Sequence, residues 1–237
     1  MFSETYSKSL FQSLSENALL FAKYNAVKLT NTFPATHVGR AMGSIAKLIQ
    51  TKDDRGVDRD VFFAQKEGFD THFDIEVPLQ NLFQELDDGL SKFAKELKDK
   101  GLWDDVTVIC VSEFGRTLMG NTGNGSDHAW GGNYFVMGGG VDGGKILGEY
   151  PTDLSNNSPL VFSPGIVLPT TPWESVWSAV SEWFGVTDPA EIAKILPNKD
   201  KFTGLWDAAD IFKPGSFGAE EAASKNTEQN IFAEMYA

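Results

Sequence analysis

Apolar side chains recur at the spacing of an amphipathic helix in five stretches of the chain. Side chains three or four positions apart lie on one face of a helix, so this spacing predicts a helix with one buried face. The longest stretch ends before Gly101, a residue type that commonly terminates helices. The predicted helices span residues 6–28, 38–50, 77–100, 172–184 and 188–196.

Short apolar runs predict the strands. Residues 61–64 and 106–111 are apolar at successive positions, a pattern typical of strands covered on both faces, and residues 133–137 form a third run. The helix over 77–100 lies between the first two runs, and this order predicts a right-handed βαβ unit with parallel strands. The sequence therefore predicts an α/β fold, with a mostly parallel sheet sandwiched by helices.

The length of the chain favours one domain. The 237 residues, 41% of them hydrophobic, are enough to bury one large core. We expect a single domain over residues 1–212 and a tail of weak periodicity over 213–237. Cys110 is the one cysteine and lies in an apolar run, which favours a buried, inert thiol.

The charge balance disfavours nucleic acid and anionic membranes as partners. Lys and Arg number 20 and Asp and Glu number 33, so the formal net charge is −13, which repels both over most of the surface. No stretch approaches the roughly 20 apolar residues that a membrane span requires. The first residues lack the basic start, apolar core and small-residue cleavage site of a signal peptide.

Three segments carry the side chains most suited to chemistry. Asp70 and His72 follow the first predicted strand, Glu113 follows the second, and a loop rich in glycine contains Asp127 and His128. Because ligands of open α/β sheets bind at the edge where parallel strands end, we expect these segments to meet there.

A mixed set of carboxylates and imidazoles predicts a divalent metal ion. Zinc is favoured, with manganese, magnesium or calcium as alternatives. Either histidine alone would more often be a hydrogen-bonded loop residue, but two of the three histidines stand beside an aspartate, and we interpret the third, His37, as a capping or surface residue. The predicted ligands are Asp70, His72, Glu113, Asp127 and His128.

Two further residues are candidates for contact with a substrate. Arg116 follows Glu113 closely, and its guanidinium fork matches a pair of phosphate or sulfate oxygens, which predicts a catalytic, substrate-binding residue. The alternative is a salt bridge to a neighbouring carboxylate. Trp130 stands beside His128 in a polar loop and is the aromatic residue most suited to contact a substrate.

The ordered set GFDTH, SEFGRT and GSDHAWGGNYFVMGGG resembles the DUF1501 family, over about residues 61–151. The resemblance implies an alkaline-phosphatase-like or sulfatase-like fold, truncated at its N-terminus, that acts on phosphate or sulfate monoesters through two metal ions. It also implies that Asp70, His72, Glu113 and His128 are ligands, that the nucleophile lies on an earlier strand, and that export is possible in the family.

Three functions remain open at this point. The first is a metal-dependent hydrolase of small anionic esters or of phosphorylated or sulfated sugars, or an inactive fragment of one. The second is a non-catalytic structural or binding subunit whose fold other protein chains complete. The third is a module that binds sulfated sugars through a metal without turnover.

Overall fold

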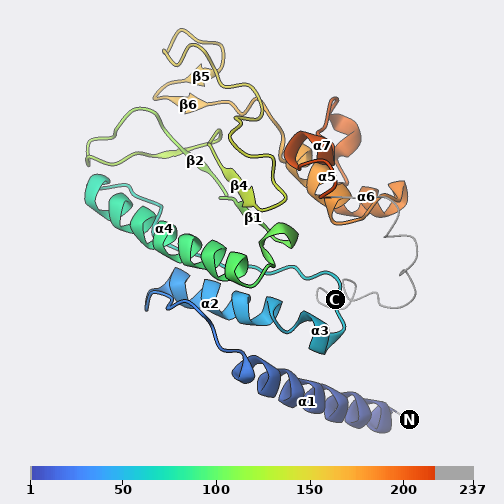
Figure 1. The fold of residues 1–237 in the computed structure, drawn as a ribbon. Coiled ribbons are helices and arrows are strands. Elements are labelled where there is room, and N and C mark those ends of the chain that lie inside the picture. Colours follow the sequence, from blue (N-terminus) through green and yellow to red (C-terminus); the bar gives the residue numbers. More distant parts are fainter. Residues whose placement is uncertain (1, 217–237) are drawn as a thin grey trace. The chain divides into compact units, whose positions relative to one another are not determined.

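A computed structural model describes residues 2–216, which form two compact units (Figure 1). Of the described residues, the first unit contains 2–103 and 116–128, and the second contains 104–115 and 129–216. The prediction of one domain over residues 1–212 stays a prediction, and most of the predicted tail, residues 217–237, lies outside the described residues.

Helices dominate the first unit. In chain order these are α1 (Phe2–Ala26), α2 (His37–Ile49), the single-turn α3 (Lys52–Arg55) and α4 (Glu76–Asp99). Periodicity predicted the three long helices. Helix α2 begins after Thr36, whose side chain accepts a hydrogen bond from the Gly39 amide. The side chain of Thr36, and not that of His37, therefore caps the helix.

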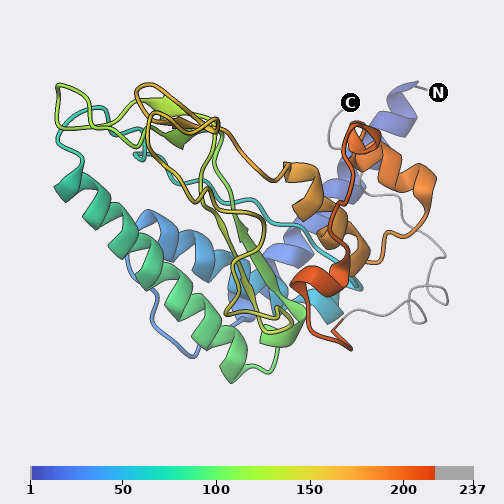
Figure 2. The same ribbon diagram turned by 90° about the horizontal axis from the view of Figure 1, so that it is seen from above.

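Helices α2 and α4 pack side by side and bury their apolar faces (Figure 2). The two helices approach closely at Gly89, where a Cβ atom would lie 2.7 Å from Cγ1 of Val38. The absence of a side chain there lets the ridges of the two helices interlock. The buried apolar residues are Val38, Met42, Ala46 and Ile49 of α2 and Leu90, Phe93, Ala94 and Leu97 of α4.

A fully buried carboxylate joins α4 to the connection between α1 and α2. Glu96 is 0% exposed. Its oxygens accept hydrogen bonds from the backbone amide of Thr30 at 3.0 and 3.1 Å and from the backbone and side-chain nitrogens of Asn31 at 2.8 and 2.9 Å. Three donors, in four hydrogen bonds, thus compensate the removal of this charge from water.

The second unit combines short strands with short helices. Strands β1 (Thr107–Cys110) and β4 (Phe135–Gly138) pair antiparallel, and so do β5 (Val161–Phe162) and β6 (Ile166–Val167). The helical elements are η1 (Trp103–Asp105), α5 (Trp173–Trp183), α6 (Pro189–Ile195), η2 (Lys199–Lys201) and α7 (Ala208–Ile211). Two very short strands, β2 (Gly115–Arg116) and β3 (His128–Ala129), form a third sheet, of which Arg116 and His128 belong to the first unit.

The core of the second unit lies where α5 meets α7. Phe212 is 1% exposed, and its ring stacks on Trp183 at 5.0 Å with 11° between the planes. Val141, Ala179, Ala208 and Ile211 complete the buried cluster. Cys110 is a free, partly buried cysteine, and burial raises the pKa of its thiol, while the inert role predicted for it stays a prediction.

The prediction of a mostly parallel sheet sandwiched by helices is wrong. Within residues 2–216 the strands form short two-stranded sheets, and β1 pairs antiparallel with β4 instead of parallel with residues 61–64. Residues 61–64 lie in an extended segment without strand pairing, where Val61 is 67% and Phe63 is 84% exposed. An apolar run shows that a segment is suited to a strand, but it does not determine the partner of that strand.

The end of helix α4 was predicted more accurately from the sequence than the pairing of the strands. Helix α4 ends at Asp99, and Gly101 has a positive φ of 67°, the left-handed conformation that favours glycine at a helix terminus. Among the described residues, no helix combines the length and apolar character needed to cross a membrane.

Candidate metal centre

Two loops of the first unit, far apart in sequence, are joined by backbone hydrogen bonds. The amides of Asp74 and Ile75 donate to the carbonyls of Gly123 and Asn124 at 2.9 and 3.0 Å, and the Ser126 amide donates to the Thr71 carbonyl at 3.2 Å. This pairing aligns residues 70–75 with the glycine-rich loop. Backbone contacts between loops therefore position the site.

Glycine allows the close approach of these loops. At Gly125 a Cβ atom would lie 2.2 Å from the carbonyl carbon of His72, a distance that real Cβ atoms do not adopt. A side chain at this position would push the glycine-rich loop away from His72. The small residue thus contributes directly to the geometry of the site.

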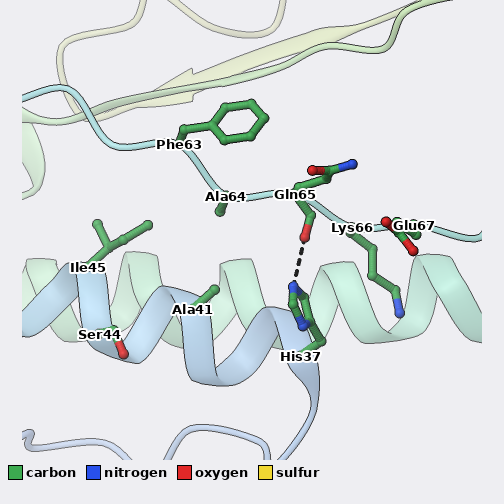
Figure 3. A pocket seen from close by; sticks show the side chains of 9 residues that line it. All are labelled: His37, Ala41, Ser44, Ile45, Phe63, Ala64, Gln65, Lys66 and Glu67. Atoms are coloured by element: carbon green, nitrogen blue, oxygen red, sulfur yellow. Dashed lines mark hydrogen bonds between the residues drawn. The ribbon is translucent and has the colours of Figure 1, made fainter. Parts of the chain in front are cut away.

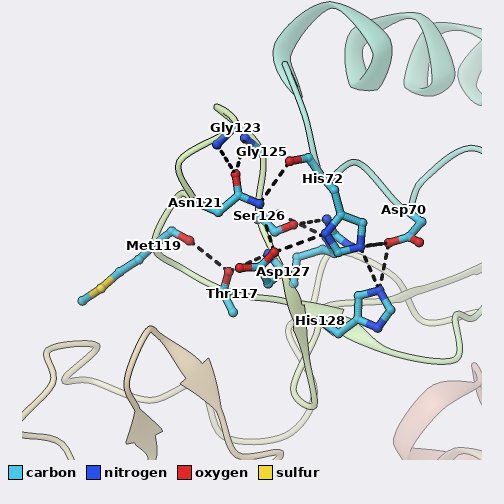
Figure 4. A network of polar contacts seen from close by, with 11 residues as sticks. Asp70, His72, Thr117, Met119, Asn121, Gly123, Gly125, Ser126, Asp127 and His128 are labelled. Atoms are coloured by element: carbon cyan, nitrogen blue, oxygen red, sulfur yellow. Dashed lines mark hydrogen bonds and ion pairs between the residues drawn. The ribbon is translucent and has the colours of Figure 1, made fainter.

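Asp70, His72 and His128 bring three potential ligand atoms together (Figure 4). Oδ1 of Asp70 lies 3.0 Å from Nε2 of His72 and 3.0 Å from Nε2 of His128, and the two Nε2 atoms are 3.1 Å apart. Ligands about 2.1 Å from an ion are separated by about 3.0 Å across an octahedral face and about 3.4 Å across a tetrahedral one. The group could therefore hold one metal ion.

Asp127 contacts the opposite side of the His72 ring. Its Oδ1 lies 3.2 Å from Nδ1 of His72. A carboxylate at this distance accepts the Nδ1 proton, and the neutral ring then presents the lone pair of Nε2 to Asp70 and His128. This arrangement favours a role for Asp127 in orienting His72.

Asn121 holds Asp127 in place, and backbone contacts fix the orientation of its amide. Its Oδ1 accepts hydrogen bonds from the amides of Gly123 and Gly125 at 2.9 and 3.1 Å, so the other end of the group is the nitrogen. This Nδ2 donates to Oδ1 of Asp127 at 2.9 Å and to the His72 carbonyl at 3.0 Å (Figure 4).

Both carboxylates of the site favour the ionised form. Desolvation raises the pKa of Asp70, but hydrogen bonds from Arg116 and His128 outweigh it and leave the pKa below its ordinary value. Hydrogen bonds from Asn121 and His72 lower the pKa of Asp127. Two ionised carboxylates beside two imidazoles make a site suited to a cation.

Arg116 binds protein groups on three sides. Its Nη1 lies 2.5 Å from Oδ1 of Asp70, Nε donates to Oγ of Ser126 at 3.0 Å, and Nη2 donates to the Ser126 carbonyl. The salt bridge considered from sequence is thus present. The substrate-binding role of Arg116 stays a prediction.

The remaining sequence candidates, Glu113 and Trp130, belong to the second unit. Glu113 is exposed and accepts a hydrogen bond from Oγ of Ser112 at 3.3 Å, and Trp130 is 67% exposed. Their predicted roles, as metal ligand and substrate contact, stay predictions.

A separate groove of about 730 Å³ lies in the first unit between α2 and the extended segment (Figure 3). His37, Ile45, Phe63 and Lys66 contribute to its lining, and Nε2 of His37 lies 2.8 Å from the Gln65 carbonyl. None of the predicted metal ligands lines this groove.

Comparison with protein families supports the resemblance noted from the sequence. A family model described as "Protein of unknown function (DUF1501)" matches residues 50–161. The match is a likeness to DUF1501 over a little less than half of the chain. Comparisons with curated proteins and with solved structures gave no significant match.

The DUF1501 match includes both loops of the site and all the candidate metal ligands and substrate contacts named from sequence. Sequence reasoning nevertheless missed Asn121. The sequence did indicate a turn at this position, because asparagine next to glycine is typical of turns in which the side-chain amide forms hydrogen bonds with nearby backbone groups. A turn signal does not show which distant residues the same amide will contact.

Replacement of Asn121 by alanine is expected to weaken metal binding about 10- to 100-fold, because Asp127 would lose the donor that positions it against His72. Isothermal titration with Zn²⁺ measures the effect. Asn17→Ala is the matched control, since Asn17 is exposed on α1 and its Nδ2 donates to the Ser13 carbonyl at 2.9 Å. Equal affinities of wild type and Asn121→Ala would contradict the orienting role of Asn121.

Proposed function

We propose that this protein is a metal-dependent hydrolase of phosphate or sulfate monoesters, with an ion held by Asp70, His72 and His128. The observation that carries the proposal is the convergence of their three ligand atoms within 3.1 Å of one another. Two imidazoles and one carboxylate form a donor set found in catalytic zinc sites and in other open transition-metal sites. We favour zinc, with manganese as the first alternative.

The site also has the openness that catalysis requires. The side chains of Asp70 and His128 are 53% and 52% exposed. Three protein ligands leave further coordination positions for water or substrate. When bound, a divalent ion supplies a Lewis acid and lowers the pKa of a coordinated water.

Hydroxyl groups beside the cluster are poorly placed for attack on a substrate. Thr71, Thr117 and Ser126 are 6–7% exposed. Oγ1 of Thr117 donates to the Met119 carbonyl at 2.9 Å, and Oγ of Ser126 accepts from Arg116. We therefore assign the attack to a water molecule, with Arg116 as the residue that binds the anionic group of the substrate.

Phosphate and sulfate monoesters are the substrate class that the resemblance to DUF1501 implies. Small esters of this class, and phosphorylated or sulfated sugars, carry a tetrahedral group with one or two negative charges. A divalent ion and a guanidinium fork can both bind the oxygens of such a group.

The test combines metal content with hydrolysis. Protein purified without added metal is analysed by mass spectrometry, and p-nitrophenyl phosphate and p-nitrophenyl sulfate are then assayed with Zn²⁺ or Mn²⁺. We expect about one equivalent of metal and metal-dependent release of p-nitrophenol, with both lost in His128→Ala. A wild-type protein that binds neither ion after supplementation would refute the proposal.

A second function, a non-catalytic binding or structural subunit, is favoured by the exposed apolar side chains of α1. Tyr6, Phe11 and Phe21 are 70%, 72% and 67% exposed, and exposed apolar side chains in this number favour contact with another protein. Metal binding without hydrolysis of either ester, together with self-association in sedimentation experiments, would support this second function.

A further inference from the structure

The Oδ1 atom of Asp70 has more nitrogen neighbours than a carboxylate oxygen accommodates. Nε2 of His72, Nε2 of His128 and Nη1 of Arg116 lie 3.0, 3.0 and 2.5 Å from this one atom. A carboxylate oxygen offers about two lone-pair directions. An ion at the cluster would occupy one of them, so the ion and the guanidinium approach the same small region.

We propose that Arg116 and the metal ion compete for Oδ1 of Asp70, and that an oxyanion bound by Arg116 relieves this competition. This proposal rests on the metal site of the proposed function. The guanidinium carries a full positive charge 2.5 Å from a ligand oxygen, and this charge repels a divalent ion at the same oxygen. An oxyanion that pairs with Nη1 draws that charge away from Asp70.

The attachment of Arg116 to Ser126 keeps the guanidinium near the cluster during this exchange. Nε bonds Oγ of Ser126 at 3.0 Å, Nη2 bonds its carbonyl, and Ser126 is 6% exposed. Nη1 can therefore leave Oδ1 without the side chain leaving the site. The anion that then pairs with Nη1 lies beside the ion.

The net charge of the site predicts that the metal ion binds before the oxyanion. With neutral histidines, the carboxylates of Asp70 and Asp127 and the guanidinium of Arg116 together carry one negative charge, and a divalent ion changes this to one positive charge. The site therefore repels an oxyanion before the ion binds and attracts it afterwards. By linkage, the oxyanion must then raise the affinity for the ion by the same factor.

The test is a competition titration of Zn²⁺ against a chromophoric chelator, with and without sodium sulfate at constant ionic strength. In the wild type, sulfate is expected to raise zinc affinity several-fold. In Arg116→Gln, zinc affinity without sulfate is expected to rise about tenfold, because the competing charge is gone, and sulfate no longer changes it. Circular dichroism checks that each variant is folded.

Two variants separate charge from position. Arg116→Lys keeps a positive charge near Asp70, and its zinc affinity without sulfate should stay close to that of the wild type or fall below it. Arg40→Gln is a control for the loss of an arginine elsewhere in the unit, since Nη1 of Arg40 contacts the Ala35 carbonyl. Arg40→Gln should keep both the affinity and the sulfate effect.

The outcomes distinguish this proposal from the one it rests on. If the wild type binds zinc and Arg116→Gln binds it equally or more weakly, Arg116 orients Asp70 and the competition is refuted, while the metal site stands. Persistence of the sulfate effect in Arg116→Gln would also refute it. If the wild type binds neither Zn²⁺ nor Mn²⁺, both proposals are wrong.

Discussion

Replacement of His72 by alanine is expected to lower zinc affinity on the order of a thousandfold, the largest effect of any single change at the site. His72 has two roles, because Nε2 belongs to the ligand group while Nδ1 holds Asp127. Alanine removes a ligand and leaves the Asp127 carboxylate without its ring partner. Competition titration against a chelator of known affinity measures the change.

His37→Ala is the matched control for this experiment. His37 contacts the Gln65 carbonyl and is not among the ligand group of the cluster, so its removal should leave zinc affinity unchanged. Comparable zinc affinities for wild type and His72→Ala would show that zinc binds at another place. A loss in His37→Ala equal to that in His72→Ala would indicate a general effect of histidine removal.

Replacement of Glu96 by alanine is expected to lower the free energy of unfolding by about 3 kcal/mol, the largest stability effect considered. The change leaves a cavity at a position that is 0% exposed, and it removes the acceptor of the Thr30 and Asn31 amides. Urea denaturation at neutral pH measures the loss. Asp87→Ala is the control, since Asp87 is an exposed residue of the same helix and should change stability by less than about 0.5 kcal/mol.

The contribution of Glu96 should also depend on pH. Desolvation raises the pKa of Glu96, but hydrogen bonds from Asn31 and Thr30 outweigh it and leave the pKa below its ordinary value. A carboxyl whose pKa is lowered on folding stabilises the protein above the pKa of the unfolded chain, and this stability is lost as pH falls through the folded value. The difference in stability between wild type and Glu96→Gln should therefore shrink in acid. A constant difference down to pH 3 would contradict this.

The candidate site was found from the sequence by an argument that is partly wrong. Asp70, His72 and His128 do come together, but not at the common edge of parallel strands. Backbone bonds between residues 71–75 and the glycine-rich loop align them instead. Residue chemistry identified the potential ligands because Asp and His beside each other are scarce in this chain, whereas the topology was inferred from apolar runs that do not specify a partner.

The sequence by itself determined the long helices, the glycine at the end of α4 and the residue types that could bind a metal, because each of these is a local property of the chain. Tertiary structure decided that β1 pairs with β4, that Asn121 positions Asp127, and that Arg116 and the two histidines converge on one oxygen of Asp70. These contacts join residues up to 58 positions apart. Such pairing depends on which distant groups the folded backbone brings within hydrogen-bonding distance, and periodicity along the chain carries no information about that.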